Sequence, residues 1–481
     1  MRMGMKSSPR GKLSWGKSLV TAALILVFLT LSSSQNANAL PAFARKYGLR
    51  CSACHESWPM LNYFGQKFKD NGYQLMNDRD APIWQNPAYW PVTFRIIPIW
   101  HRVSTGKVAV DQGTGITRVT TSGFDISGLD FHTGGTLEKN FSFYVLPSSD
   151  NTASFHFETV MARLDNLFGS PWFNIKLGKF ELDNLLSEKR ILTLTGNGGI
   201  YQLYHFSPVG DGNNFGQMGD NQLGVELMGH SYDDRTRYSA ALLSSTDGNP
   251  GLPYGNAYTG FFAASRAFDA GKLGVDRIGA YAMIGQAATT YLTQGGTPLG
   301  GSGAGNKSFS REGFVGQFYF GQHFDLQVVT QHGQDSAWFG QGYGNPIDNQ
   351  GAPNAIGVAA LPAGAQGPTW NGVLFEPHYV YSPQLIFIGR YETIHMSRQA
   401  NGSACTACTG GIGSGPSASN LGNIETYTVG FRYNPFMTSR AGFAWHNEYN
   451  WLHQDGTGPL VGATGLNVNT SEVLTGFDFD F

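Results

Sequence analysis

The pattern that most constrains the fold runs from about residue 92 to the last residue of the chain. There the sequence divides into sixteen segments with the two-residue period of β-strands, and no stretch sustains the period of a helix. The segments begin near residues 94, 118, 138, 153, 171, 222, 235, 258, 273, 311, 324, 369, 384, 424, 437 and 472. This pattern predicts an all-β fold with an even number of strands.

The connections between these segments alternate in length. The longer ones include residues 182–221, 286–310, 335–368, 396–423 and 452–471, and the short ones include 233–234, 269–272, 322–323, 382–383 and 435–436. Outer-membrane barrels combine an even number of strands with short periplasmic turns and long extracellular loops, whereas a sandwich or a propeller has no reason to alternate in this way. The sequence therefore predicts a 16-stranded antiparallel outer-membrane β-barrel, porin-like, over residues 92–481.

The last segment shows which face is expected to meet lipid. Phe477, Phe479 and Phe481 lie on one side of a strand there, and Asp478 and Asp480 lie on the other. Aromatic side chains facing outward and polar ones facing inward are typical of a membrane barrel. The terminal Phe481 also resembles the C-terminal aromatic signature by which such barrels are recognised for assembly.

The composition excludes several other classes of protein. Charged residues make up only 14% of the 481 residues, 64 residues are glycine, and the formal net charge is -2. A chain without a basic block has no electrostatic footprint for nucleic acid, so no nucleic-acid partner is expected. The aromatic content of 13% argues against disorder.

Residues 1–39 read as a secretory signal peptide. Basic residues precede an apolar core at 19–31, and Ala37-Asn38-Ala39 supplies a small-x-small cleavage site. An uncleaved membrane anchor is the alternative, but the apolar core is short for a membrane-spanning helix. We expect the exported chain to begin at Leu40.

The four cysteines form two pairs with different surroundings. Cys51, Cys54 and His55 form the C-x-x-C-H motif of covalent c-type haem attachment, a dozen residues after the export signal. The two thiols add across the haem vinyl groups, and the adjacent imidazole is an axial ligand of the iron. The motif predicts one covalently attached haem c.

Cys405 and Cys408 lack such a histidine and lie among glycines and serines. A zinc site would need two more ligands nearby, and a redox-active pair would need a cationic neighbour that lowers a thiol pKa. We predict a disulfide between Cys405 and Cys408, as an oxidising compartment favours, with a redox-active pair as the alternative.

The segment around the haem motif is predicted to form a small helical domain, residues 40–91. Leu61, Phe64 and Phe68 recur at helical spacing, and Asn71-Gly72 ends the pattern. Met76 is the preferred distal iron ligand, because a helix and a turn can carry it around the haem. Met60 and His101 are the alternatives, and any of these methionines can instead be core filler.

An even number of strands places both ends of the barrel on the periplasmic side. A barrel of sixteen strands encloses an aqueous channel by itself, and the segment 40–91 has an expected radius of gyration of about 10 Å, comparable to such a lumen. We expect this segment to plug the lumen. The alternative is a haem domain that hangs below an open porin.

The run Pro41-Ala42-Phe43-Ala44-Arg45-Lys46-Tyr47-Gly48, followed by the haem motif and a sixteen-strand pattern, resembles the fused monohaem cytochrome-porin family of outer-membrane iron oxidases. The resemblance implies that extracellular ferrous iron, or another reductant, donates electrons through the haem to a periplasmic c-type cytochrome. Cys51, Cys54 and His55 carry over from the family motif, whereas the distal ligand does not.

The residues themselves leave three functions open. The first is this inward transfer of electrons, an iron oxidoreductase activity. The second is an outward conduit for respiration on external acceptors, and the third is a diffusion porin whose haem only holds a plug. The potential of the haem decides the direction of flow, and the axial ligands and burial set that potential. The loops suggest no iron ligand, and no dinucleotide or phosphate-loop motif occurs.

Overall fold

The computed structural model describes residues 41–57, 60–75, 80, 91–111, 113, 115–149, 154–183, 203–206, 216–219, 221–246, 248, 257–288, 291–292, 298–299, 306–336, 367–398, 423–437, 441–454 and 468–481. Three predictions lie outside these residues: the signal peptide at 1–39, the distal ligand Met76, and the disulfide between Cys405 and Cys408. These three stay predictions.

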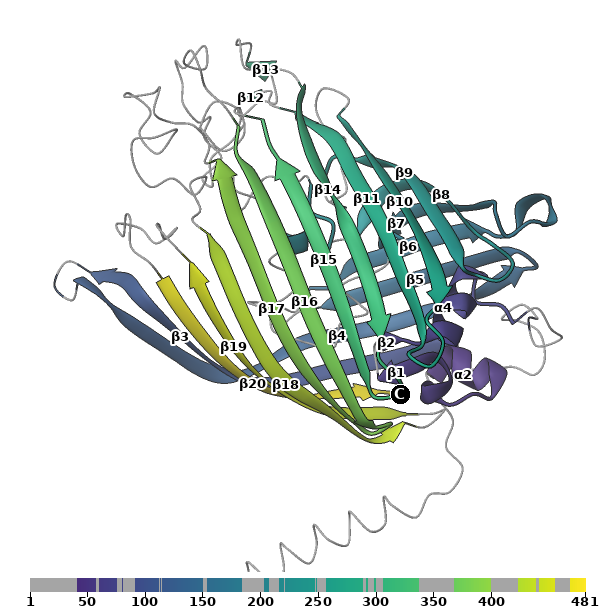
Figure 1. The fold of residues 1–481 in the computed structure, drawn as a ribbon, viewed down its shortest axis with the longest axis horizontal. Coiled ribbons are helices and arrows are strands. Elements are labelled where there is room, and N and C mark those ends of the chain that lie inside the picture. The colour runs from purple at the N-terminus through teal and green to yellow at the C-terminus, as the bar shows by residue number, and fades with distance from the viewer. Residues whose placement is uncertain are drawn as a thin grey trace, which may run out of the picture. The chain divides into compact units, whose positions relative to one another are not determined.

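Sixteen antiparallel strands close into one barrel, which confirms the predicted β architecture (Figure 1). The strands are β3 (Val92–Asp111), β4 (Gly115–Glu138), β5 (Phe141–Ser149), β6 (His156–Leu164), β7 (Asn174–Phe180), β8 (Gln222–His230), β9 (Thr236–Ser244), β10 (Tyr258–Asp269), β11 (Val275–Ala288), β14 (Asn306–Tyr319), β15 (Phe324–Gln334), β16 (Thr369–Ser382), β17 (Leu385–Arg398), β18 (Ile424–Met437), β19 (Gly442–Gln454) and β20 (Val468–Asp480). Each strand pairs with the next, and β20 closes the barrel by pairing with β3. The small strands β12 (Tyr291–Leu292) and β13 (Pro298–Leu299) pair with each other in a separate two-stranded sheet.

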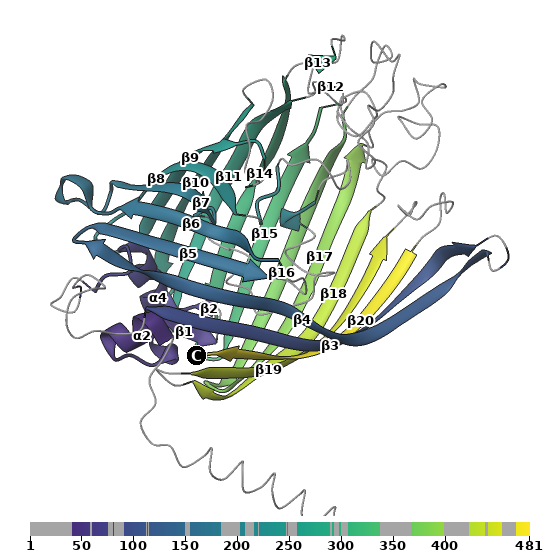
Figure 2. The same ribbon diagram turned by 180° about the vertical axis from the view of Figure 1, so that it is seen from behind.

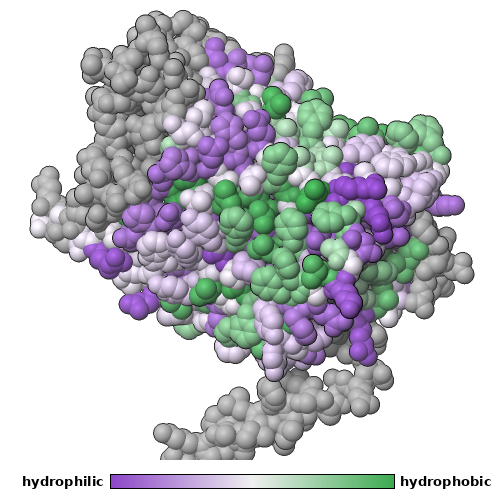
Figure 3. Space-filling view, in the orientation of Figure 1, coloured by the Kyte–Doolittle hydropathy of each residue, from purple (hydrophilic) through white to green (hydrophobic). Residues whose placement is uncertain are grey.

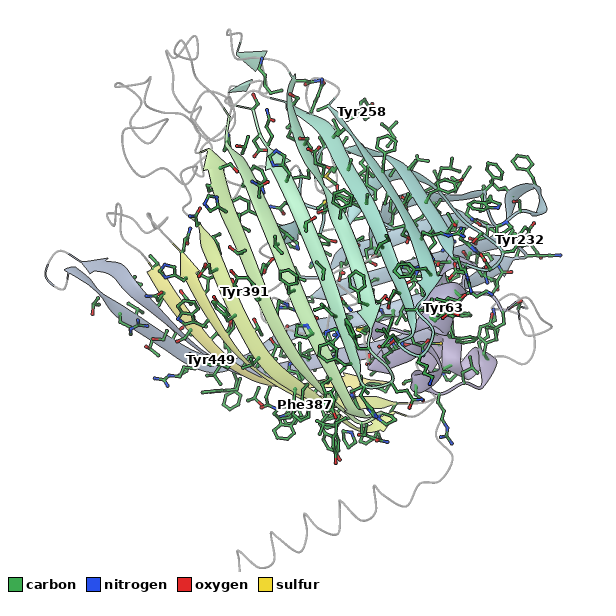
Figure 4. The ribbon with its side chains drawn as sticks, in the orientation of Figure 1. Tyr63, Tyr232, Tyr258, Phe387, Tyr391 and Tyr449 are labelled. Carbon is green, nitrogen blue, oxygen red and sulfur yellow. The ribbon has the colours of Figure 1, made fainter. Side chains whose placement is uncertain are left out.

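The two-residue period separates an outer face from an inner one, as predicted. In β20, Phe477 and Phe479 are 41% and 38% exposed, whereas Asp478 and Asp480 are buried. Hydrophobic side chains gather over the middle of the strands on the face seen in Figure 3. Exposed aromatic residues also occur near both ends of the strands, such as Tyr232 and Tyr258 in Figure 4. This is the surface that a membrane-spanning barrel presents to lipid.

The alternation of connections is also confirmed from β7 onward. The short connections at 231–235, 270–274, 320–323 and 383–384 alternate with long ones such as 181–221 and 335–368. One predicted turn is wrong, because Pro435 and Phe436 lie inside β18 and the next strand begins only at Gly442. The pairing of β18 with β19 shifts between Tyr433 and Phe436, and such a bulge lets a strand continue past a proline that cannot donate a hydrogen bond.

Both ends of the barrel lie at the end that carries the short connections. Phe94, near the start of β3, exchanges two backbone hydrogen bonds with the terminal Phe481, at 2.8 and 2.9 Å. Figure 2 shows the strands β3 to β8 on the opposite side from β14 to β17, with the N-terminal helices near this same end. The segment before β3 is therefore connected to the short-turn end of the barrel.

Helices and a short hairpin precede the barrel. They are α2 (Pro41–Tyr47), α3 (Cys51–Cys54), the paired strands β1 (His55–Ser57) and β2 (Met60–Leu61), and α4 (Tyr63–Asp70). The described residues contain no helix that is both long and apolar enough to cross a membrane. We call residues 41–57 and 60–75 the N-terminal segment.

A large apolar cluster lies on the inward-facing side of the strands, and we call it the inner cluster. It joins Tyr47 and Phe68 of the N-terminal segment to strand residues such as Trp370 and Leu374, and it includes Leu203 from the connection between β7 and β8. Because alternate residues of β16 are buried, Trp370 and Leu374 share the inward face. Side chains of one of the long connections and of the N-terminal segment therefore pack into a single core with the barrel wall.

Candidate functional site

The haem motif lies on a short helix whose position is set by the turn before it. The helix α2 ends at Tyr47, and the next residue, Gly48, has a positive φ of 66° and donates to the Ala44 carbonyl at 2.7 Å. The helix α3 then carries both cysteines, and His55 caps it in an extended conformation as β1 begins. The two thiols and the imidazole thus occupy one helical turn and the residue that follows it.

The motif residues are shielded from solvent. Cys51 and His55 are 5% and 8% exposed, and Cys54 is half-buried. Burial raises the pKa of the Cys54 thiol to about 11, so the thiol is protonated at neutral pH. A disulfide oxidoreductase needs a lowered thiol pKa, so this cysteine does not have the electrostatics of a redox-active thiol.

The helix α4 packs directly against the motif. Asn62 caps its first turn by accepting a hydrogen bond from the Gly65 amide at 2.9 Å. A Cβ atom on Gly65 would lie 2.1 Å from the carbonyl oxygen of Cys54, so only glycine permits this approach. The sequence predicted this helix, but its apolar stripe was wrong in part: Phe68 is buried, whereas Phe64 is 40% exposed and Leu61 belongs to β2.

Aromatic rings link the helices of the N-terminal segment to one another and to β5. The ring centroids of Phe43 and Tyr73 are 4.8 Å apart, and those of Tyr47 and Phe68 are 5.3 Å apart. Tyr73 stacks in turn on Tyr144 of β5, with centroids 6.1 Å apart. The Phe-Ala-Arg-Lys-Tyr run before the motif thus contributes packing residues.

Buried ionic contacts tie the end of α4 to the barrel wall. Arg163 of β6 donates to the carbonyl oxygens of Lys69 and Asp70, at 2.8 and 2.9 Å. The Asp70 carboxylate pairs with Arg237 of β9 at 3.0 Å. A cation at the last carbonyls of a helix is favourable because those carbonyls carry partial negative charge. The N-terminal segment is therefore fastened from two different strands.

A second set of buried polar groups lies near the motif on β15, β16 and β17. His378 is hydrogen-bonded to Asp325 at 2.9 Å and to Glu376 at 2.7 Å, and Glu376 also accepts from Arg390. We did not predict this cluster, although Glu376 and His378 two residues apart on one strand face was a signal for it. Glu56 lies one residue past His55. Burial and, to a smaller extent, the negative charge of Asp325 raise the pKa of the Glu56 carboxyl to about 7.

The alternative distal ligands occupy ordinary structural positions. Met60 is 1% exposed and packs against Ile386 and Ile388 of β17, and the Gln327 amide donates to its sulfur at 3.4 Å. His101 of β3 lies 3.5 Å from Glu472 of β20. Met60 of β2 therefore packs against the barrel wall, and both alternative ligands stay predictions.

A cavity of about 700 Å³ opens between the residues that follow the motif and the barrel wall. Glu56, Met60 and Tyr63 line it on one side, and residues of β10, β11, β14 and β15 line it on the other. Figure 4 labels Tyr63 beside these strands. The volume is within the range of cofactor sites, about 300–1,000 Å³.

The donor set at the motif fits a c-type haem. Two cysteine sulfurs and one histidine nitrogen are the groups that the attachment chemistry requires. The cavity is lined by Glu56 and the residues from Met60 onward, and not by Cys51, Cys54 or His55 themselves. Within the described parts of the chain, no three His, Cys, Asp or Glu residues lie close enough together to hold a metal ion.

Comparison with known proteins gives similarities of structure only. No protein-family profile and no curated protein sequence matches the chain. An anion-selective porin from Comamonas acidovorans has 12% identity, with 81% of this chain and 99% of that chain covered, at a TM-score of 0.46. Pseudomonas putida OprB has 11% identity, 81% and 94% coverage and a TM-score of 0.47. The outer-membrane protein OmpT of Vibrio cholerae has 10% identity, 80% and 99% coverage and a TM-score of 0.42.

Proposed function

We propose that this chain is an outer-membrane electron-transfer protein that oxidises an extracellular donor, ferrous iron, and passes the electrons to a periplasmic c-type cytochrome. Cys51 and Cys54 would hold one haem covalently, and His55 would be an axial ligand. When bound, the haem supplies reversible one-electron oxidation and reduction. The observation that carries the proposal is the C-x-x-C-H motif on a segment that is fastened to the inner wall of a sixteen-stranded barrel.

The location in the outer membrane follows from the surface of the barrel. Aromatic and aliphatic residues such as Phe477 and Val429 face outward, and Val429 is 60% exposed. In water such a surface would be an interaction site or an aggregation hazard, and lipid is the environment that it fits. We place the short-turn end, and with it the N-terminal segment, on the periplasmic side.

The barrel interior supports electron transfer over diffusion of solutes. Leu203, Tyr204 and Phe206 are nearly inaccessible to solvent and lie against inward-facing residues; Phe206 packs on Trp370 with ring centroids 5.2 Å apart. The backbone of Leu203 is also held there, by Glu392 at 2.6 Å and Gln331 at 3.1 Å. We infer that an apolar core of this kind blocks hydrated solutes, whereas an electron needs only a cofactor within reach of both sides.

The N-terminal segment has a positioning role in this account. Arg163 and Arg237 hold the end of α4, and the close contact of Gly65 with the Cys54 carbonyl holds α4 against the motif. The residues that would bind the haem are therefore attached to a rigid wall at the short-turn end, where a soluble periplasmic cytochrome can approach.

The direct test is anaerobic addition of ferrous iron to the oxidised, detergent-purified protein while the haem absorption bands are followed. We expect prompt reduction in the wild-type protein and no haem spectrum in a Cys51→Ala, Cys54→Ala double variant of the same folded barrel. Reduction by dithionite but not by ferrous iron would reject iron as the donor and favour outward transfer. A purified protein that carries no covalent haem would reject the proposal as a whole.

A further inference from the structure

The hairpin of β1 and β2 begins at His55 and returns to the haem motif. His55 has an extended conformation, with φ −121° and ψ 137°, and it pairs with Leu61 of β2. The amide of the next residue, Asn62, donates to the Cys54 carbonyl at 2.9 Å. The hairpin is therefore a closed loop of chain that starts and ends at the second cysteine of the motif.

The barrel wall holds the first strand of this hairpin through Glu56. The Tyr319 hydroxyl of β14 donates to Oε1 of Glu56 at 3.0 Å. The Gln317 side-chain amide donates to the same hydroxyl oxygen at 2.8 Å. Because an amide N–H cannot accept, the proton of the Tyr319 hydroxyl is directed to Glu56. Gln317 and Tyr319 are two residues apart on one strand and line the same cavity, so they share its inward face.

The wall holds the second strand of the hairpin through Met60. The Gln327 amide of β15 donates to the Met60 sulfur at 3.4 Å, and the Met60 side chain packs on β17. Gln327 lies directly opposite Gln317 in the pairing of β15 with β14. The contacts to Glu56 and Met60 therefore come from neighbouring strands of the wall, and they are separate from the contacts that fasten α4.

The contact between Glu56 and the wall also fixes the direction of the preceding side chain. Successive side chains of an extended segment point to opposite sides. Glu56 lines the cavity beside β14, and His55 does not. The imidazole of His55 is therefore directed to the side of β1 that is turned away from this cavity, and a rotation of β1 would move both side chains together.

We propose that Tyr319 is a positioning residue for the axial ligand: through Glu56 it holds β1 in one orientation and so fixes the plane of the His55 imidazole. The inference rests on the proposed function, because His55 is an iron ligand only when the haem is bound. Gln327 supports the same hairpin through β2. A residue of the barrel, distant from the motif in the sequence, thus sets the geometry of an iron ligand.

The test records the electron paramagnetic resonance spectrum of the oxidised, full-length protein, because the g values of a ferric haem depend on the orientation of its axial ligands. Tyr319→Phe keeps the ring and removes the hydroxyl, and we expect the largest g value to shift and its line to broaden. Glu56→Gln removes the charge but keeps a carbonyl oxygen that can accept from Tyr319, so its spectrum should match that of the wild type. Tyr281→Phe is the matched control, because the Tyr281 hydroxyl donates at 2.9 Å to the Thr330 carbonyl and joins one wall strand to another.

Hydrogen exchange of the β1 and β2 amides gives a second measurement, which needs no haem. The loss of one hydrogen bond to a carboxyl group should speed this exchange about tenfold in Tyr319→Phe, whereas Tyr281→Phe should stay within about threefold of wild type. If Tyr319→Phe does not fold, Glu56→Ala removes the acceptor instead of the donor. It should give the same shift in the g value that Glu56→Gln does not give.

A largest g value that is the same in Tyr319→Phe as in the wild type would overturn the inference. So would a spectrum that changes as much in Glu56→Gln as in Tyr319→Phe, because charge and not position would then govern the ligand. Equal shifts in Tyr319→Phe and Tyr281→Phe would also overturn it, since they would report a general loosening of the wall.

The proposed function and this positioning role fail separately. Wild-type protein without covalent haem would reject the proposed function before any tyrosine variant is made. A haem that ferrous iron reduces, with a spectrum indifferent to Tyr319, would reject only the positioning role.

Discussion

Arg163 offers the sharpest test of how the N-terminal segment is held in the barrel. It is 1% exposed on β6, donates two hydrogen bonds to the last carbonyls of α4, and forms an ion pair with Asp165 at 2.6 Å. The substitution Arg163→Met keeps the apolar stem of the side chain and removes only its donors and charge. It therefore isolates the contribution of these contacts to docking.

The size of the effect follows from the two hydrogen bonds to α4. A hydrogen bond from a charged donor contributes about 1.5–3 kcal/mol, so the pair contributes roughly 3–6 kcal/mol. The loss of the Asp165 partner weakens the barrel itself whether or not the segment is docked, and Asp165 keeps its hydrogen bond from Ser142 at 2.7 Å. Docking should therefore weaken by at least about 3 kcal/mol, which is more than a hundredfold in the equilibrium constant.

Hydrogen exchange of the α4 amides in the detergent-folded protein measures this change. Exchange in Arg163→Met should be about a hundredfold faster than in wild type, because the segment opens more often. Arg118→Met is the matched control: Arg118 is an exposed residue of β4 that donates to Ser104 and does not contact the described part of the N-terminal segment. Exchange rates within threefold of wild type, in an Arg163→Met barrel with normal heat-dependent gel mobility, would refute the reasoning.

Three further predictions test the site, the interior and the pH dependence. Cys51→Ala or Cys54→Ala should abolish the two-bond attachment of haem, measured as the pyridine haemochrome per protein. Met76→Ala should shift the absorption spectrum and the potential of the haem, and an unaltered spectrum would assign Met76 to packing. Wild-type protein should give no porin-sized conductance in planar bilayers, whereas a triple variant with glycine in place of Leu203, Tyr204 and Phe206 should conduct. An open channel in the wild-type protein would contradict the inference that the interior is sealed. Burial lowers the pKa of the Lys46 ammonium to about 8 from its ordinary value of 10.5. The folded state therefore binds this proton more weakly than the unfolded chain does. Docking of the N-terminal segment should tighten as the pH rises from about 8 to about 10.5. Lys46→Met should remove that pH dependence of protease resistance in the N-terminal segment, and an identical profile for both proteins would argue against it.

The barrel could be predicted from the sequence because its two faces meet different surroundings. Residues that face lipid, such as Phe477, are apolar, and residues that face the lumen, such as Asp478, are polar. The two-residue period of a strand is therefore visible as an alternation of apolar and polar residues in the sequence. Five strands, β8, β10, β15, β16 and β18, begin at the predicted residue. The prediction of a turn at Pro435 was wrong. Proline usually ends a strand, but here a bulge in the pairing of β18 with β19 accommodates it.

The candidate site could be predicted only where its chemistry is local in sequence. Cys51 to His55 form a contiguous motif, whereas Asp325 meets His378 through strand pairing between residues far apart in the chain. The inward position of Leu203 likewise depends on a distant glycine: a Cβ on Gly372 would lie 2.1 Å from the Leu203 side chain. Such contacts depend on register and closure of the barrel, which a single sequence does not specify.

Transfer of electrons across the membrane is the central claim, and proteoliposomes test it most directly. Oxidised cytochrome c is enclosed in vesicles that carry the protein, and ferrous iron is added outside under anaerobic conditions. A trapped ferrous chelator in parallel vesicles reports any entry of the ion itself. The account predicts reduction of the enclosed cytochrome without entry of iron, and no reduction with the Cys51→Ala, Cys54→Ala variant. An enclosed cytochrome that stays oxidised, while the haem of the same protein in detergent is reduced by iron, would contradict it.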